Sequence, residues 1–443
     1  MEAGKVNDLK TYKQTICDVI DRNRDKIISI GEKILNNPEM GFKEFKTSKL
    51  VDELFKEIGL KDITHHAITG VKGWLKGKSN KICIAILGEL DAVLSPNHPY
   101  ADKQTGAAHA CGHNTQIAAL IGTAIGFKTS QILDKLDGHI CFFAVPAEEH
   151  VEIEYRKELL KEGKISYLSG KQELIVSGAF DDIDMALMTH SETNSPIPRV
   201  VVNGTAMGTI GKTVQFIGKE AHAGGAPHEG INALNAASIA IMCINAQRET
   251  FKDQDSVRVH PIITKGGDLV NTVPADVRME SFVRANNIEA LQNANKKVNR
   301  AIEGASYAVG TEVKIDDMIG YMPLQQNKQM SKLFAENAAY LLGKDKVYTD
   351  IPFAGSTDMG DLGYVMPVIQ PTISGFTGNA HSKDFTVSDP EYAYIIPAKL
   401  MAMTIIDLLT NNAEEAEKVK QSHPRKTIQQ YKNKWDDILE IKE

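Results

Sequence analysis

The residues best suited to carry out chemistry lie in the stretch "HACGHN", at positions 109–114, which holds two histidines and one cysteine. Imidazole nitrogen and thiolate sulfur are ligands of borderline divalent metals such as zinc. His109, Cys111 and His113 alternate with small residues, so all three side chains would point the same way at the end of an extended strand. Gly112 would let the backbone approach a ligand closely. The spacing therefore predicts one part of a metal site.

Four further residues of ligand type lie elsewhere in the chain. Glu148 and Glu149 are adjacent in "PAEEH" (146–150), after an apolar run, where two carboxylates are awkward to bury without a cation or another partner. His190 ends the run "MALMTH", and His381 lies in the loop "GNAHSKDF". Each of these residues taken alone could have a purely structural role. Together, mixed cysteine, histidine and glutamate ligation predicts zinc, with manganese or cobalt as the alternatives.

The elements that must position these residues are apolar strands. The runs at 81–90 ("KICIAILGEL"), 139–149 and 185–192 are rich in apolar residues, which is typical of strands buried on both faces of a sheet. Helical stretches lie between them, so the pattern predicts an α/β fold with helices on both sides of the sheet. Ligands of such sheets bind beyond the carboxyl ends of the strands. The candidate metal ligands are expected at that edge.

The pattern changes between residues 203 and 315. There the order strand, helix, strand, strand, helix, strand predicts a ferredoxin-like βαββαβ unit that is large enough to be its own domain. We therefore expect a first catalytic part at 1–202, an inserted domain at 203–315, and a second catalytic part at 316–443 that ends in a solvated helical extension. The expected strands of the insertion are 209–217, 256–264, 276–284 and 311–317, its helices are 231–248 and 287–304, and the catalytic domain resumes with a helix at 328–342 and a strand at 364–373.

Composition limits the classes of function. A chain of 443 residues is long enough for two hydrophobic cores. The formal net charge of −7, with both signs interspersed, disfavours nucleic acid as the main partner. We identify no apolar run of the roughly 20 residues that span a bilayer, and the polar N-terminus lacks the apolar core of a secretory signal. We therefore expect a cytoplasmic protein with no membrane partner and, because the five cysteines are scattered, no disulfide framework.

Seven motifs, taken in order, make the sequence resemble the aminoacylase and carboxypeptidase family of di-metal metallopeptidases. Within it the chain is similar to the amidohydrolase branch, which includes indole-acetyl-amino-acid hydrolases and aminobenzoyl-glutamate hydrolases. The resemblance runs from about Asp21 to Leu409 and implies a phosphorylase/hydrolase-like catalytic domain with the ferredoxin-like insertion as a lid. The motifs are "GELDAV" (88–93), "HACGHN" (109–114), "PAEE" (146–149), "GKEAHAGGAPHEGINAL" (218–234), "NTVPADV" (271–277), "GSTDMGD" (355–361) and "AHSKDF" (380–385).

Carried over residue by residue, the resemblance implies two divalent metal ions. Cys111 takes the bridging place that other branches give to an aspartate. Glu148 matches the catalytic glutamate, and Asp91 matches an aspartate that orients a ligand histidine and fixes its tautomer. The implied metal ligands are Cys111, His113, Glu149, His190 and His381.

Four positions in or next to these motifs have no assigned ligand role. Glu89 stands where other branches have His or Asp, which leaves open whether it helps to hold metal. Leu94 stands where many members have proline, and Asn114 replaces the commoner Asp of "CGHD". We interpret His109 as a supporting residue rather than a ligand.

The insertion has polar residues of its own. His222 lies in the glycine-rich loop "AHAGGAPHEG" and Asn271 begins a loop between two strands, so both could simply serve loop geometry and helix capping. The resemblance instead implies that His222 stabilises the tetrahedral oxyanion, often across a dimer, and that Asn271 contacts the carboxylate of the substrate. Arg284 and His228 are further candidate carboxylate contacts. Asp358 is either a pocket residue or a helix N-cap.

These residues permit metal-assisted hydrolysis of an amide, in which two cations acidify a shared water and Glu148 carries its proton to the leaving nitrogen. We expect a homodimeric enzyme that removes an acyl or aroyl group from an amino acid, with an aminobenzoyl-glutamate-like substrate favoured. A small-dipeptide hydrolase of the same branch is the close alternative. A non-catalytic metal- or ligand-binding relative is disfavoured because Glu148 is present. A serine hydrolase is disfavoured because no serine lies in a nucleophile-elbow context.

Overall fold

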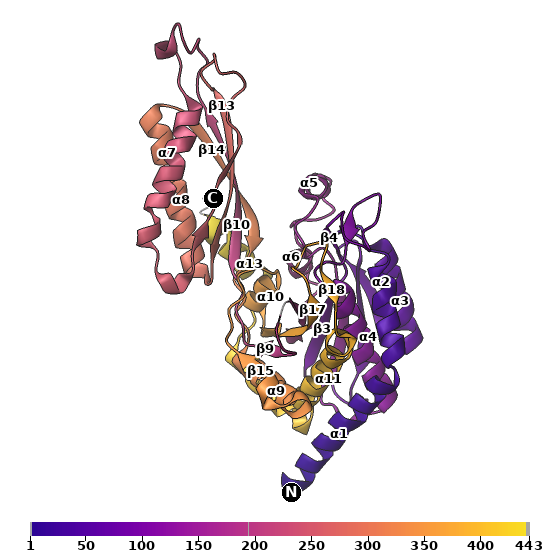
Figure 1. Ribbon diagram of the computed structural model, residues 1–443. Helices are drawn as coiled ribbons and strands as arrows, with labels where there is room; N and C mark the ends of the chain where they lie inside the picture. The colour runs from indigo at the N-terminus through magenta and orange to yellow at the C-terminus, as the bar shows by residue number, and fades with distance from the viewer. Residues whose placement is uncertain (1, 194, 440–443) are drawn as a thin grey trace. The chain divides into compact units, whose positions relative to one another are not determined.

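Figure 1 shows the protein as a computed structural model, which describes residues 2–193 and 195–439. The chain forms two compact units, which are described separately. The second unit begins at Thr205, two residues after the expected start of the insertion, extends to Leu324 rather than to residue 315, and takes in two further segments. The first unit comprises Met1–Gly204, Gln325–Pro352 and Asp361–Ile428, and the second comprises Thr205–Leu324, Phe353–Gly360 and Gln429–Glu443.

The first unit is built on a six-stranded mixed sheet in the order β1-β2-β6-β3-β7-β16. Strands β6, β3, β7 and β16 run parallel, whereas β1 and β2 form an antiparallel edge. The strands expected at 81–90 and 139–149 are present and almost fully buried, as their apolar runs predict. The six strands are β1 (Lys61–His66), β2 (Gly70–Lys76), β3 (Cys83–Glu89), β6 (His139–Val145), β7 (Met185–Leu187) and β16 (Val368–Ile369).

A second sheet of this unit has the order β15-β9-β17-β18, with β8 paired to β17. It corrects two expectations. The strand expected at 185–192 is two strands in different sheets, β7 and β8. The strand expected at 364–373 is the end of a helix followed by two short strands, because Pro367 and Pro371 have no N–H to continue a ladder. The strands of this sheet and of the small β4-β5 pair are β4 (Val93–Leu94), β5 (Ala107–Ala108), β8 (His190–Thr193), β9 (Val200–Val202), β15 (Val347–Thr349), β17 (Thr372–Thr377) and β18 (Thr386–Val387).

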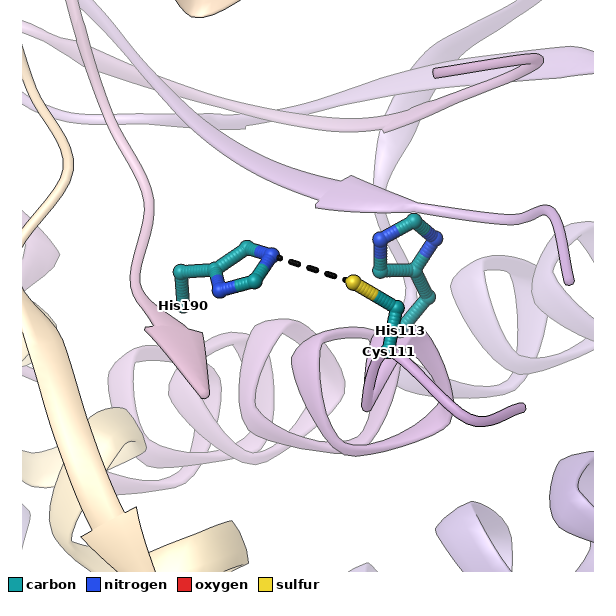
Figure 2. A group of neighbouring side chains, drawn as sticks. All are labelled: Cys111, His113 and His190. Atoms are coloured by element: carbon teal, nitrogen blue, oxygen red, sulfur yellow. Dashed lines mark hydrogen bonds between the residues drawn. The ribbon is translucent and has the colours of Figure 1, made fainter. Parts of the chain in front are cut away.

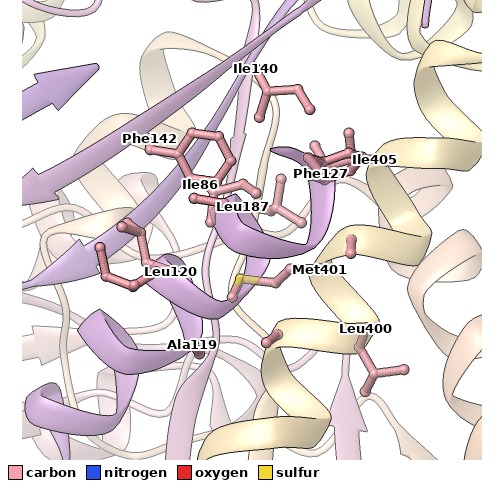
Figure 3. Packing of buried hydrophobic residues seen from close by; sticks show 14 of the residues in the cluster. Ile86, Ala119, Leu120, Phe127, Ile140, Phe142, Leu187, Leu400, Met401 and Ile405 are labelled. Atoms are coloured by element: carbon pink, nitrogen blue, oxygen red, sulfur yellow. The ribbon is translucent and has the colours of Figure 1, made fainter. Parts of the chain in front are cut away.

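Helices α4 and α11 pack against each other in the core of the first unit, and α4 also packs on β3. Figure 3 shows Leu120 and Phe127 of α4 and Met401 and Ile405 of α11 in one cluster with residues of the strands. Helices α1 and α2 also pack against α4, and α1 packs against α11 as well. The helices are α1 (Glu2–Arg22), α2 (Arg24–Leu35), α3 (Phe45–Ile58), α4 (His113–Ser130), α5 (Ile153–Lys161), α6 (Gly170–Val176), α9 (Lys328–Leu342), α10 (Met359–Val365), α11 (Ile396–Leu409) and α12 (Glu414–Ser422).

No apolar run long enough to span a bilayer is expected from the sequence, but one helix of the structure reaches that length. Together with the π-helical turn Glu391–Ile395, α11 forms an apolar helix over Glu391–Leu409 that could cross a membrane by length and composition alone. Of its most apolar stretch, 89% is buried inside the protein. We therefore interpret it as the central helix of a packed core.

The second unit is an antiparallel sheet with two helices on one face (Figure 1). Along β13, buried and more exposed side chains alternate, as expected for a sheet that is covered on one side only. The strand expected at 256–264 is divided into β11 and β12, and Pro261 lies between them. The elements are β10 (Gly208–Ile217), α7 (Ala233–Ala246), β11 (Arg258–Val259), β12 (Ile262–Lys265), β13 (Asp276–Ala285), α8 (Ile288–Val309) and β14 (Glu312–Tyr321).

The C-terminal region is helical, as expected, but the expectation that it is solvated is wrong. Helix α13 (Ile428–Leu439) buries Tyr431, Trp435 and Ile438 completely. These residues recur at helical spacing, so they form the apolar face of an amphipathic helix. All but the first residue of α13 belongs to the second unit.

Candidate active site

The candidate site lies at the carboxyl ends of the parallel strands of the first unit, where α/β sheets bind their ligands. Glu89 is the last residue of β3, and Glu148 and Glu149 follow the end of β6. His190 is the first residue of β8, shortly after β7 ends. His381 lies in the loop between β17 and β18.

Two groups of ligand-type side chains meet there, and they share Cys111. In the first group, the donor atoms of Cys111, His113 and His190 lie within 4.8 Å of one another, with Cys111 Sγ 3.5 Å from His190 Nε2 (Figure 2). The second group joins Cys111 to Glu149 and His381 within the same limit, and His381 Nε2 is 3.0 Å from Glu149 Oε1. The structure thus brings together all five residues that the sequence indicates as ligands.

A turn, rather than an extended strand, brings Cys111 and His113 together. Strand β5 ends at Ala108, Gly112 adopts a left-handed conformation with φ 86°, and His113 begins α4. A Cβ atom on Gly112 would also lie 3.1 Å from the side chain of Ser191, so glycine suits this position sterically as well. The expected alignment of three side chains along a strand is therefore wrong.

His109 does not join either group. It is buried, and neither ring nitrogen has a hydrogen-bond partner among the described residues. Burial, together with the nearby His113, lowers the pKa of His109 to about 3, so the ring is neutral at physiological pH. Its surroundings are those of a packed side chain, in line with its interpretation as a supporting residue. Asn114 is also buried, and it donates to the backbone oxygen of Gly31.

Asp91 links two of the candidate ligands. Its Oδ1 lies 3.2 Å from His113 Nδ1, its backbone oxygen lies 2.8 Å from the same nitrogen, and its Oδ2 accepts the backbone N–H of Glu149 at 2.8 Å. Burial raises the pKa of Asp91, but the contact with His113 outweighs it and the pKa is lowered. Because Nδ1 of His113 is engaged by Asp91, Nε2 is the nitrogen left to face an ion.

The loop that carries Glu148 and Glu149 is held in an unusual conformation. Ala147 has φ 53°, its N–H donates to Glu44 Oε1 at 2.8 Å, and its oxygen accepts the N–H of Gly170. The two glutamates join different groups: Glu149 lies with Cys111, whereas Glu148 lies within 4.8 Å of Glu89 and His113. Glu148 is buried and near, but outside, the two groups that share Cys111.

Glu89 stands in a buried polar network that sequence reasoning did not foresee. Its Oε2 lies 2.9 Å from His113 Nε2 and accepts a hydrogen bond from Gln116, while its Oε1 lies 2.6 Å from Lys171 Nζ. Burial raises the pKa of Glu89, but the charges of Lys171 and His113 lower it well below its usual range. Lys171 lies in the short helix α6, and no motif in the sequence marks it.

The state of these side chains fits divalent metal ions. His113 Nε2 is buried without a well-formed hydrogen bond among the described residues. Burial lowers the pKa of His190, which favours the neutral imidazole that ligates metals. Burial, with Glu149 adding to it, raises the pKa of the Cys111 thiol well above its usual value, so a neighbouring cation is required to ionise it.

The polar residues predicted in the insertion lie in the second unit. His222 Nδ1 accepts the N–H groups of Gly224 and Gly225, and His222 Nε2 lies 3.3 Å from Asn271 Nδ2. His222 and Asn271 are thus neighbours. Arg284 donates to the hydroxyl of Ser356 at 3.0 Å. The two other candidates differ in burial, because His228 is exposed and Asp358 is fully buried.

The fold and the site together define a hydrolase of the α/β metallopeptidase type. The family model of peptidase family M20/M25/M40 matches residues 85–405, and the chain belongs to this family. It is therefore a metal-binding hydrolase that acts on amide bonds.

Curated relatives match over most of their length at low identity. The chain is 26% identical to a mouse Xaa-Arg dipeptidase over 91% of this chain and 90% of the relative. It is 27% identical to an N-acetyl-L-cysteine deacetylase of Bacillus subtilis over 92% and 94%, respectively. It is also 26% identical to one of the subunits of the p-aminobenzoyl-glutamate hydrolase of Escherichia coli, over 68% and 59%. A solved structure of a dinuclear metal-binding M20 peptidase from Bacillus subtilis shares the fold, with a TM-score of 0.70, 22% identity and coverage of 88% and 99%.

Proposed function

We propose that the protein is a two-metal amidohydrolase that cleaves N-acyl or N-aroyl amino acids. The observation that carries this proposal is that two groups of three ligand-type side chains share Cys111. Cys111, Glu149 and His381 would hold one ion, and Cys111, His113 and His190 the other. The dinuclear metal binding reported for the Bacillus subtilis neighbour supports this assignment. The mixed sulfur, nitrogen and oxygen donors of these five side chains suit zinc, with manganese or cobalt as the alternatives.

When bound, such ions polarise the scissile carbonyl and acidify water. Side chains of the protein transfer the proton and position the candidate ligands. We assign Glu148 as the general base that takes a proton from the attacking water and returns it to the leaving nitrogen. Its burial, at 6% exposure, keeps bulk water from competing for that proton. Asp91 fixes the ring of His113 and the backbone of Glu149.

We propose that the first unit is a phosphorylase/hydrolase-like catalytic domain and that the second unit is its ferredoxin-like lid domain. The role that we assign to the second unit is substrate recognition. His222 would stabilise the oxyanion of the tetrahedral intermediate, and Asn271 would contact the substrate's carboxylate. The contact between their side chains supports a joint role. Arg284, which is half-buried, would supply a cation to the carboxylate of the released amino acid.

The relatives support both substrate classes considered from the sequence. The deacetylase and the aminobenzoyl-glutamate hydrolase act on acyl or aroyl groups linked to an amino acid, whereas the mouse relative is a dipeptidase. We favour N-acyl and N-aroyl amino acids, and retain small dipeptides as the second candidate because the dipeptidase matches over nine-tenths of both chains. We also propose a cytoplasmic homodimer that forms through the second unit. Analytical ultracentrifugation would test the dimer.

The central experiment separates ion binding from catalysis. Metal-free protein is reloaded with zinc, manganese or cobalt and screened by mass spectrometry against N-acyl amino acids, aminobenzoyl-glutamate and dipeptides. The Glu148→Ala variant should keep two bound ions, as measured by elemental analysis, and lose about 100- to 10,000-fold in kcat. Undiminished hydrolysis by this variant would overturn the mechanism, and a wild-type protein that holds fewer than two ions would overturn the two-metal site.

A further inference from the structure

The loop that carries Glu148 and Glu149 meets a buried guanidinium group. Arg156 of α5 is fully buried, and its Nη2 donates to the backbone oxygen of Glu149. Its Nη1 donates to the backbone oxygen of Leu168 at 2.6 Å and lies 3.5 Å from that of Ala147. The guanidinium therefore contacts the backbone on both sides of Glu148, the proposed base.

Within the part of the chain that the structure describes, no carboxylate pairs with Arg156, and its Nε has no hydrogen-bond partner. A buried charge destabilises a fold unless a counter-charge or polar groups compensate it. Here the compensation comes from backbone oxygens and from the ring of Phe42, whose centre lies 5.4 Å from Arg156 Cζ. The guanidinium thus serves the backbone of the loop rather than an ion pair.

Glycine at position 41 makes room for this contact. A Cβ atom on Gly41 would overlap the guanidinium of Arg156 and would lie 2.9 Å from the Cα atom of Ala147. Ala147 also packs with Phe42 and with Leu159 of α5 in a small apolar cluster. Helix α5 is therefore docked on the loop by close packing as well as by hydrogen bonds.

Arg156 also ties together the two ends of one excursion of the chain. The backbone passes from Glu149 into α5 and returns at Leu168, so the contacts of Arg156 close the neck of that segment. A second bond at this neck runs from the N–H of Gly170, the first residue of α6, to the oxygen of Ala147 at 3.0 Å. Such links reduce the number of conformations open to the residues beside the neck.

We propose that Arg156 is the positioning residue for Glu148. It holds the carbonyl group of Glu149, closes the neck beside it, and so keeps the Glu148 carboxylate where it can take a proton from the attacking water. This inference rests on the proposed function, in which Glu148 is the base. The competing role is a buried guanidinium that only stabilises the fold, and two measurements separate these roles.

Hydrogen exchange measures the order of the loop without any assay of activity. Arg156→Met removes the charge and the donors at similar length. In metal-free protein, exchange followed by mass spectrometry should become about 10- to 100-fold faster at the amides of residues 147–151, as expected from the loss of a hydrogen bond to a charged group. Exchange in β3 and β6 should stay unchanged. Acceleration of equal size in all these peptides would overturn the positioning role, because it would show a general loss of stability.

Kinetics of the metal-loaded protein measure the consequence for Glu148. Arg156→Met should lower kcat by about 10- to 100-fold, with a smaller change in KM, because a displaced base transfers the proton less well. Arg156→Lys keeps a charged donor that can reach one carbonyl oxygen, so it should show the same local effects at smaller size. This second variant also decides the question if Arg156→Met does not fold. Equal kcat in wild type and the folded variants would overturn the role of Arg156 in positioning the base.

Arg425 provides a matched control. It also donates to two backbone oxygens, those of Phe180 and Ile183, but these residues precede β7 and so lie at the opposite end of the strands from the site. Arg425→Met should leave kcat and the exchange of residues 147–151 unchanged, and a loss equal to that of Arg156→Met would overturn the proposal. A wild-type protein that hydrolyses none of the screened substrates would contradict the proposed function itself, whereas the exchange data would still show whether Arg156 orders the loop.

Discussion

Glu44 accepts the backbone N–H of Ala147 at 2.8 Å, although the two residues are far apart in the sequence. Its other oxygen accepts the hydroxyl of Thr69 at 2.7 Å, and the carboxyl group is fully buried. Ala147 has a positive φ and immediately precedes Glu148, so this hydrogen bond helps to fix the backbone that carries the proposed base. The contact connects the start of α3 with the loop that carries Glu148.

Removal of the Glu44 side chain should harm both stability and catalysis. Glu44→Ala leaves the N–H of Ala147 without its partner, which should lower the free energy of unfolding by about 1–3 kcal/mol. Displacement of Glu148 should lower kcat by up to about 100-fold. Urea unfolding and steady-state kinetics measure the two effects. Glu39→Ala is the control, because Glu39 binds the backbone at Lys46 and Thr47 instead, so it should lose stability with kcat unchanged.

The same carboxyl group should make stability depend on pH. Burial, with the charge of Asp91 adding to it, raises the pKa of Glu44 from 4.5 to about 8. Between these values the folded protein holds a proton that the unfolded chain has lost, so this contribution to stability is present below pH 4.5 and is lost as the pH rises through 8. Metal-free wild type and Glu44→Gln are compared by urea unfolding from pH 5 to 9. The stability of wild type relative to the variant should fall with rising pH, and parallel curves would contradict the assignment.

Metal removal should destabilise the first unit alone, because the proposed ligands all lie in it. An ion that binds only the folded state, at 100 times its dissociation constant, adds about 2.7 kcal/mol to the free energy of unfolding. Calorimetry of metal-free and zinc-loaded protein should show an upward shift in the transition of the first unit and none in that of the second. Magnesium, which prefers oxygen ligands, should have little effect. Equal transitions with and without zinc would count against the metal site.

The proposed oxyanion role of His222 predicts an effect on turnover. His222→Ala should lower kcat by about 100- to 1,000-fold, the usual loss for one oxyanion donor, with a smaller change in KM. Glu229→Ala is the matched control, since Glu229 is an exposed residue of the same loop region with no assigned role. A loss of equal size in both variants would point to disruption of the loop rather than to loss of a donor.

The last helix should be essential to the second unit. Trp435 is fully buried, so Trp435→Ala should lower the free energy of unfolding by about 3–5 kcal/mol. Lys432→Ala changes an exposed residue of the same helix and should stay within about 0.5 kcal/mol of wild type. The two variants are compared by chemical unfolding monitored by far-UV circular dichroism, because this signal reports backbone structure and not the tryptophan itself. Similar stabilities for both variants would restore the hypothesis of a solvated extension.

Elements with a strong local signal were predictable from the sequence. The helix expected at 328–342 is confirmed with the same bounds, and the side chain of Asn327 caps it by accepting the N–H groups of Gln329 and Met330. The apolar strands that end beside the site are also present, because burial on both faces leaves a continuous apolar run in the sequence. What local patterns could not provide was the exact path of the backbone between such elements.

The finer geometry of the site depends on contacts that leave no local pattern. The turn at Gly112 could not be told from a strand end, since glycine suits either conformation. Lys171 and Gln116 meet Glu89 only in the folded chain, and nothing in their sequence surroundings distinguishes them from ordinary helix residues. The candidate ligands that meet at Cys111, by contrast, were all named from the sequence, because four of them lie in the motifs that carry the family resemblance and His190 ends an apolar run.

The division of the chain also has a consequence for how the second unit is completed. The chain passes from one unit to the other at residues 204–205, 324–325, 352–353, 360–361 and 428–429. Helix α13 supplies buried aromatic side chains to the second unit, yet it follows every helix and strand of the first unit in chain order. The inserted segment alone therefore does not complete the core of the second unit, which lacks these buried side chains until α13 joins it.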